Sequence, residues 1–359
     1  MTSAANKQLV FAMLNEMAAA SPKRSREVLE KYCHPDAVFE VFHPFNTLRG
    51  LNAAATEFFE PLKASFPDYG QRVGLCIAGT YEDRDLVSTL GHVIGTFSRP
   101  WIGIPATHGL TYLRFGFNAI VVDGKVAKAY ILLDIVDVMR QAGHYPFRVM
   151  PGSAEQWPLP PADTGASTFA VDGDLGAETL RIVREMQSGL GSGTDLADHV
   201  ATVDHSPHWH DHMNWYGPAG IGSTRGQRGF DDYHGALFIQ AFPDRAGFPR
   251  VPGGRENAPG HYIQAGDGRF GVTGGWPSLQ GTHTGGQWLG LPPTNRRIEM
   301  RVADWYRIDD AYKISDNWVL IDIPHILDQM GYDLLDDLRY LVDPTIPRWV
   351  VRREAETAR

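Results

Sequence analysis

The stretch GTHTGGQWLGLPPTNRRIEM, residues 281–300, decides how this chain is interpreted. Its four glycines and the Pro292-Pro293 pair predict a loop, because both residue types interrupt regular helices and strands. The same stretch carries His283 and Trp288, an imidazole and a large aromatic ring of the kind that binding pockets use. We therefore expect a loop that also borders a functional site.

A second copy of this stretch lies earlier in the chain. Residues 95–107, GTFSRPWIGIPAT, match residues 281–294 with one residue inserted. Further matches flank it in the same order: Arg49-Gly50 with Arg225-Gly226, Phe66-Pro67-Asp68 with Phe242-Pro243-Asp244, Asp134 with Asp322, and Gln141-Ala142-Gly143 with Gln329-Met330-Gly331. Anchors repeated in one order predict a tandem duplication.

The offset between the copies grows from 176 to 188 positions along the chain. The second copy therefore holds about a dozen extra residues, and the Pro/Gly/Arg-rich segment 245–260 fits an exposed loop insertion. We predict four parts: a first, degenerate domain over 1–149, a linker over 150–170, a second domain over 171–335 that holds the functional site, and a C-terminal tail over 336–359.

Both copies have the same predicted layout of two helices, several long strands and a short closing helix. In the first copy the predicted helices are 7–20 and 51–66, and the strands 73–77, 86–96, 111–121 and 126–133. In the second copy the helices are 178–190 and 230–242, and the strands 262–265, 270–274, 298–308 and 313–321. This order predicts an α+β protein with two curved, antiparallel-rich sheets, each backed by helices.

Composition excludes several classes of protein. The chain has 359 residues, 43% of them hydrophobic, and contains no apolar run of about 18 residues that would span a membrane. Its N-terminus reads as an amphipathic helix, and Cys33 and Cys76 form no CxxC pair, so we expect a cytoplasmic protein without a disulfide framework. Residues 1–150 hold 15 basic and 14 acidic residues, and the remainder 18 and 28. That acidic second half argues against nucleic acid and membrane surfaces as partners.

The second copy resembles the SnoaL-like polyketide cyclase family, which has the NTF2-like cone fold. The resemblance rests on GTHTGGQWLGLPPTNR at 281–296, on the strand that ends Arg307-Ile-Asp-Asp, and on Trp318 and Asp322 before Gln329-Met-Gly. The first copy keeps RG, FPD, IGIPAT, VDGKV and the closing QAG but lacks GTHTG. The resemblance implies two tandem cones, each enclosing an apolar pocket.

The same resemblance implies a function. SnoaL-like cyclases are acid/base enzymes that need no metal or other cofactor, and we expect here a small apolar, aromatic or polyketide-like carbonyl compound as ligand. The alternative is a non-catalytic module for binding a small ligand or for assembly, because one fold hosts many functions. Family members usually dimerise, so we expect an intrachain pseudo-dimer and leave a further homodimer open.

Two aspartates are the candidate catalytic groups. Asp322 follows the last strand and either acts as a general acid/base or caps the helix that begins there, as Asp134 would in the first copy. The resemblance implies a catalytic aspartate on this strand, and alignment on Gln329-Met-Gly puts that position at Val319. Asp304 lies on the preceding strand, where alternation places it on one face with Tyr306. It is either a desolvated acid/base or one partner of a salt bridge.

Histidine and tryptophan concentrate in the second copy. The first copy has only one of the nine Trp and five of the 14 His, so we expect the larger and more polar pocket in the second half. Histidines spaced two apart could bind a metal, but strand spacing spreads them too widely for one tetrahedral ion, and we expect no metal. The predicted substrate-binding residues are His208, His210, His212, Trp215, His283, Trp288, Tyr306 and Trp318.

Overall fold

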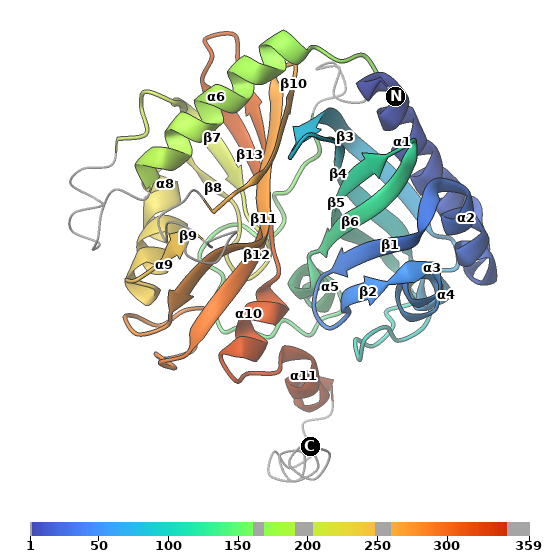
Figure 1. Ribbon diagram of the computed structural model, residues 1–359. Coiled ribbons are helices and arrows are strands. Elements are labelled where there is room, and N and C mark those ends of the chain that lie inside the picture. The colour runs from blue at the N-terminus through green and yellow to red at the C-terminus, as the bar shows by residue number, and fades with distance from the viewer. Residues whose placement is uncertain (1, 161–168, 191–203, 248–259, 343–359) are drawn as a thin grey trace.

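The computed structural model describes residues 2–160, 169–190, 204–247 and 260–342, which form two similar halves side by side (Figure 1). The first half contains α1 (Ser3–Ala19), η1 (Pro22–Arg24), α2 (Ser25–Tyr32), β1 (Cys33–Val41), β2 (Asn46–Arg49), α3 (Gly50–Ala53), η2 (Ala54–Phe59), α4 (Glu60–Ser65), β3 (Gly70–Tyr81), β4 (Arg84–Thr96), β5 (Leu110–Val122), β6 (Lys125–Leu133) and α5 (Ile135–Gln141). The second half contains α6 (Gly173–Leu190), β7 (Trp209–Tyr216), β8 (Thr224–Arg225), α8 (Gly226–Phe230), η4 (Asp231–Gly235), α9 (Ala236–Ala241), β9 (Ala246–Gly247), β10 (Ile263–Asp267), β11 (Phe270–Thr282), β12 (Arg297–Ile308), β13 (Ile314–Ile321), α10 (Ile323–Gln329) and α11 (Leu334–Val342).

The two halves repeat each other down to local geometry. The interrupted helix α3–η2–α4 recurs 176 positions later as α8–η4–α9, with a π-helical turn at the same place in each. The loop within residues 281–300 repeats the geometry of its counterpart within residues 95–107 as well. Leu289 and Gly290 have positive φ angles of 50° and 86°, and their counterparts Ile102 and Gly103 have 46° and 82°. This agreement supports the duplication.

Each half contains one mixed sheet, which confirms the predicted α+β class. The strand orders are β2-β1-β6-β5-β4-β3 and β8-β7-β13-β12-β11-β10. Neighbouring strands are antiparallel except β1 with β6 and β7 with β13, which are parallel. Strands β1 and β7 are not among the predicted strands, because Pro35 and Asp36 in β1 and the polar run in β7 are atypical of strands.

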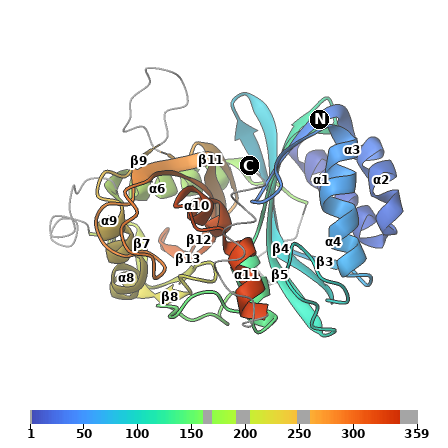
Figure 2. The same ribbon diagram turned by 90° about the horizontal axis from the view of Figure 1, so that it is seen from below.

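Helices cover the outer face of each sheet, and the inner faces of the two sheets meet (Figures 1 and 2). Trp305 of β12 is fully buried at this contact and donates a hydrogen bond from Nε1 to Ser88 Oγ of β4, at 2.7 Å. Its ring fills the space above Gly116, where a Cβ would stand 2.3 Å from Trp305 Cη2. The two sheets therefore pack against each other in one hydrophobic core.

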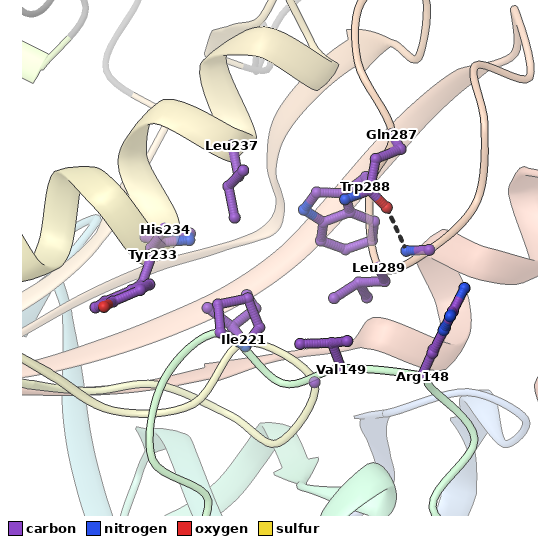
Figure 3. Close-up of a pocket in the computed structure, with 12 residues that line it drawn as sticks. Arg148, Val149, Ile221, Tyr233, His234, Leu237, Gln287, Trp288 and Leu289 are labelled. Atoms are coloured by element: carbon purple, nitrogen blue, oxygen red, sulfur yellow. Dashed lines mark hydrogen bonds between the residues drawn. The ribbon is translucent and has the colours of Figure 1, made fainter.

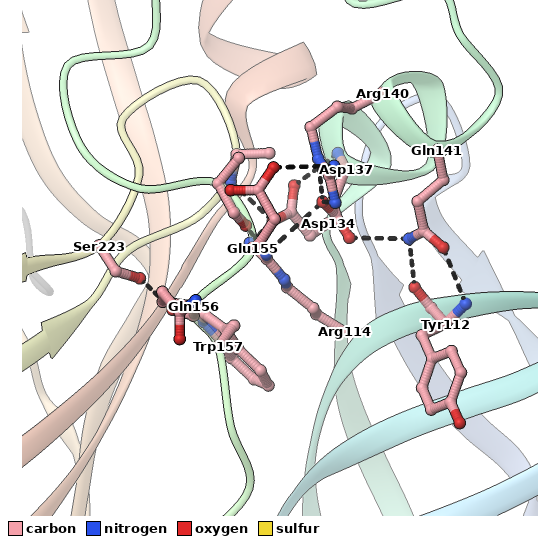
Figure 4. A network of polar contacts seen from close by, with 12 residues as sticks. Tyr112, Arg114, Asp134, Asp137, Arg140, Gln141, Glu155, Gln156, Trp157 and Ser223 are labelled. Atoms are coloured by element: carbon pink, nitrogen blue, oxygen red, sulfur yellow. Dashed lines mark hydrogen bonds and ion pairs between the residues drawn. The ribbon is translucent and has the colours of Figure 1, made fainter.

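A reciprocal pair of aspartates joins the halves. Asp134 caps α5, accepts a hydrogen bond from Arg114, and accepts another from the backbone N–H of Ala219 in the second half, at 2.8 Å (Figure 4). Asp322 caps α10, accepts from Arg301, and accepts from the backbone N–H of His43 in the first half, at 2.9 Å. Positions 43 and 219 differ by 176, the offset of the duplication, so the contact has pseudo-twofold symmetry.

Some predicted segments extend beyond the described residues. Most of the predicted insertion 245–260, part of the linker and the end of the C-terminal tail lie there. Helix α11 crosses the boundary that we predicted between residues 335 and 336. Among the helices that the structure describes, none is long and apolar enough to cross a membrane.

Candidate functional site

Strand β12 presents two different faces, as its alternation predicts. Trp305 points to the first half, whereas Tyr306 points to the helix side, where its hydroxyl lies 3.1 Å from Nε2 of Gln187 on α6. Asp304 therefore lies on the helix-covered side of the sheet with Tyr306. This side is the interior of the second half.

Asp304 is a carboxylate in a desolvated position. Asp304 is 6% exposed, and its Oδ2 atom accepts no hydrogen bond from any described residue. Burial raises the pKa of Asp304 to about 7, although hydrogen bonds from Asn317 and Tyr306 act in the opposite direction. The group can thus take up and release a proton near neutral pH.

The groups around Asp304 are uncharged at neutral pH. His261 Nδ1 lies 3.6 Å from the free Oδ2, and burial lowers the pKa of His261 to about 4. Burial also raises the pKa of Tyr306 well above its usual value, so its hydroxyl stays protonated. Gln187 Nε2 bonds Thr273 Oγ1 at 2.8 Å and thereby connects α6 to the same cluster. Asp304 is therefore surrounded by neutral hydrogen-bonding groups, and none of the described residues of the cluster is an arginine or lysine.

The sheet register connects Asp304 with the position that family resemblance implies. Asp304 is paired with Val319 across β12 and β13, so both side chains lie on the same face. In the first half, Phe117 and Ile131 occupy the corresponding pair. The second half thus has the carboxylate of Asp304 on the strand next to the expected position, Val319. The first half has Phe117 at the place of Asp304.

Both carboxylate oxygens of Asp322, the other candidate, accept structural hydrogen bonds. It is 1% exposed, and its Oδ2 accepts from Arg301 at 3.1 Å and from the His43 N–H, while Oδ1 accepts from the His325 N–H at 3.3 Å. Burial raises its pKa, and Arg301 acts in the opposite direction. Its position therefore combines the helix cap that we considered with a contact between the halves.

Of two cavities among the described residues, the larger one borders the second half. It is a cleft of about 500 Å³ at the rim, whereas a cavity inside the first half has about 10 Å³ (Figure 3). The cleft is lined by the end of the first half and the start of the linker, by the loop between β7 and β8, by η4–α9 and by the loop after β11, through Arg148, Val149, Pro151, Gly220, Ile221, Tyr233, His234, Leu237, Gln287, Trp288, Leu289 and Gly290. Of the predicted wall, Trp288 lines this cleft; Tyr306 and the 208–215 segment do not.

The remaining predicted binding residues are dispersed. Trp215 lies behind the cleft, stacked on His234 with ring centroids 4.3 Å apart. His283 is fully buried beneath its loop, bonded to Gly286 O and Thr294 Oγ1. Trp318 lies on the inner face of its sheet and donates to Pro158 O of the linker. None of these three side chains lines the cleft.

The three histidines near β7 lie at the surface. His210 and His212 are exposed, with ring centroids 5.9 Å apart, and His208 is half-buried in the turn before the strand. Within the described part of the chain, no three His, Cys, Asp or Glu side chains are grouped so that they could hold a metal ion.

His261 and Gln187 of the Asp304 cluster and His234 and Arg148 of the cleft are among the residues that we did not predict from the sequence. His261 and Gln187 come from segments distant in sequence, and only the fold brings them to the Asp304 cluster. His234 carried a usable signal, because its counterpart 176 positions earlier is Phe58.

Comparison with known proteins finds one matching family and several similar solved structures. Residues 277–330 match the family described as SnoaL-like polyketide cyclase. Similar solved structures include a candidate SnoaL-like polyketide cyclase from Jannaschia sp. CCS1 (20% identity, TM-score 0.33, 38% of this chain and 89% of that one) and IdmH, a candidate polyketide cyclase from Streptomyces antibioticus (20%, 0.33, 38% and 98%). A third is a protein with a ketosteroid isomerase-like fold from Catenulispora acidiphila, solved with trimethylamine (13%, 0.30, 38% and 92%). No curated protein sequence matches the chain.

Proposed function

We propose that the SnoaL-like polyketide cyclase domain in the C-terminal half of this chain is an acid/base enzyme that needs no cofactor, with Asp304 as its proton-transfer group. The substrate class that fits is a small apolar or polyketide-like compound with an acidic C–H between two carbonyls. The buried carboxylate carries this proposal, since its pKa of about 7 suits both removal and return of a proton at neutral pH.

The proposed chemistry requires little beyond one positioned carboxylate. Ionised Asp304 takes the proton from the carbon between the carbonyls, and the electron pair of the C–H bond passes into a delocalised enolate. The enolate carbon then attacks a further carbonyl of the same molecule, outside the enolate, and protonated Asp304 returns its proton to the new alkoxide. Tyr306 stays protonated and donates its hydrogen bond to Asp304, which holds the carboxylate in position.

Asp304 is preferred to Asp322 for a structural reason. A general base needs a lone pair that no other hydrogen-bond donor occupies. Asp304 Oδ2 has no hydrogen-bond donor among the described residues, whereas both oxygens of Asp322 are engaged in the cap and in the contact between the halves.

The proposal can be tested before the natural substrate is identified. The probe is 5-nitrobenzisoxazole, whose ring opens to a coloured cyanophenolate when a base removes its C3 proton. We expect turnover that rises with pH around a midpoint near 7. Asp304→Asn should lower the rate by about 10²–10⁴-fold, the usual contribution of a general base.

The matched control is Asp328→Asn, which removes an exposed carboxylate from α10 in the same half. It should turn over the probe at the wild-type rate. The double variant Asp304→Asn/Val319→Asp moves the carboxylate to the registered neighbour and should recover part of the activity. Equal turnover by wild type and Asp304→Asn would contradict the proposal and favour the non-catalytic binding module.

We also propose that the protein acts in the cytoplasm and that its halves satisfy the family's dimer contact internally. A fluorescent fusion tests the location. Sedimentation equilibrium tests the pairing: the internal contact alone predicts a monomer of 39.8 kDa, and a mass twice as large would show the further homodimer.

A further inference from the structure

The rim cleft of the second half has a filled counterpart in the first half. There, Phe45 stacks on Trp101 with centroids 6.3 Å apart and an interplanar angle of 25°, and Phe58 packs 5.2 Å from Phe45. Phe66 completes the group, edge-on to Trp101. Three phenylalanines thus fill the space beside this tryptophan.

The second half keeps the tryptophan but not its stacking partner. Trp288 retains the edge contact, because Phe242 corresponds to Phe66. The residues 176 positions after Phe45 and Phe58 are Ile221 and His234, and both line the cleft. Trp288 has no such stacked ring and, although only 4% exposed, lines a cavity of about 500 Å³, within the usual range for small-molecule sites.

The positive charge of the cleft lining favours an anionic ligand. Among the described residues of the lining, Arg148 is the one charged side chain at neutral pH, because none of them is Asp or Glu and burial lowers the pKa of His234 to about 4. Arg148 makes no ion pair with any described residue, and it lines the cleft together with Leu289 (Figure 3). Val149 and Tyr233 are 66% and 49% exposed, so apolar surface continues to the opening.

We propose that this cleft binds a small aromatic anion, with its ring stacked on Trp288 in the place that Phe45 takes on Trp101, and its acidic group beside Arg148. The ring of the ligand would stack on Trp288 as Phe45 stacks on Trp101 in the first half. The guanidinium would pair with a carboxylate or sulfonate. This inference is independent of the acid/base function, because Asp304 does not line the cleft and the test measures binding alone.

The test compares two dyes that share one ring system. 1-Anilinonaphthalene-8-sulfonate carries an anionic group, and N-phenyl-1-naphthylamine lacks it; both fluoresce on transfer to an apolar site. Ile221→Phe restores the counterpart of Phe45 and should weaken both dyes at least about tenfold by filling the cleft. Arg148→Gln should weaken only the sulfonate, by about three- to tenfold, the range expected for a partly exposed ion pair.

Two controls separate the cleft from other dye sites. Arg26→Gln removes an exposed arginine on α2 and should leave both affinities unchanged. Circular dichroism of Ile221→Phe should match wild type, so that a weaker signal reports the filled cleft. The proposal is overturned if wild type binds neither dye, if Ile221→Phe binds both as wild type does, or if Arg148→Gln weakens the two dyes equally.

Discussion

Replacing Asp322 by alanine should destabilise the chain by about 3–5 kcal/mol, the usual cost of removing one partner of a buried ion pair. The substitution leaves the Arg301 guanidinium, whose side chain is 13% exposed, without its carboxylate. It also leaves the N–H groups of His43 and His325 without their acceptor. The loss of the helix cap alone would cost about 1 kcal/mol, so most of the effect should come from the ion pair and the contact between the halves.

The assay is guanidinium denaturation followed by tryptophan fluorescence and circular dichroism at neutral pH. Asp134→Ala should have an equal or larger effect, because its partner Arg114 is more deeply buried, with a side chain 4% exposed. Asp328→Ala, six residues further along α10 and exposed, should stay within about 0.5 kcal/mol of wild type. A loss below about 1 kcal/mol for Asp322→Ala would refute the structural role and reopen the catalytic one.

Three further changes test other parts of the account. Trp305→Ala should cost about 3–5 kcal/mol in a denaturation experiment, because it empties the space against Gly116 and removes the bond to Ser88. His283→Ala should cost about 1–3 kcal/mol in the same assay, since the Gly286 carbonyl loses its buried donor. Folding raises the pKa of Asp304 from 3.8 to about 7, so ionisation favours the unfolded chain and wild type should lose up to about 4 kcal/mol of stability between pH 4 and 7. Asp304→Asn should lack that loss, and parallel stability curves for the two proteins would contradict it.

The duplication and the fold class could be predicted because the repeat anchors are short, chemically distinctive and in fixed order. The face of Asp304 could be predicted as well, since alternation along β12 holds in the structure. Strand β11 was predicted only to Gly274, but it continues to Thr282 through a bulge after Gly275. Glycine and Pro277 in that segment obscured the strand, because the sequence alone does not reveal a bulge.

Contacts between distant segments could not be predicted. Trp318 and Tyr306 were both expected in a pocket wall, yet Trp318 lies on the inner face of its sheet against the linker. Which aromatic ring faces the other half depends on how the two sheets meet, and periodicity within one strand carries no such information. The free Oδ2 of Asp304 and its neighbour His261 likewise depend on packing between segments far apart in sequence.

The proton affinity of Asp304 tests the central claim most directly. In protein labelled with ¹³C at the aspartate carboxyl carbons, the resonance that disappears in Asp304→Asn belongs to this group, and its chemical shift can be followed from pH 3 to pH 9. We predict a midpoint near 7, the result of burial without a cationic partner. A midpoint at or below about 4, the value of a solvated aspartate, would contradict the assignment of Asp304 as the acid/base of this domain.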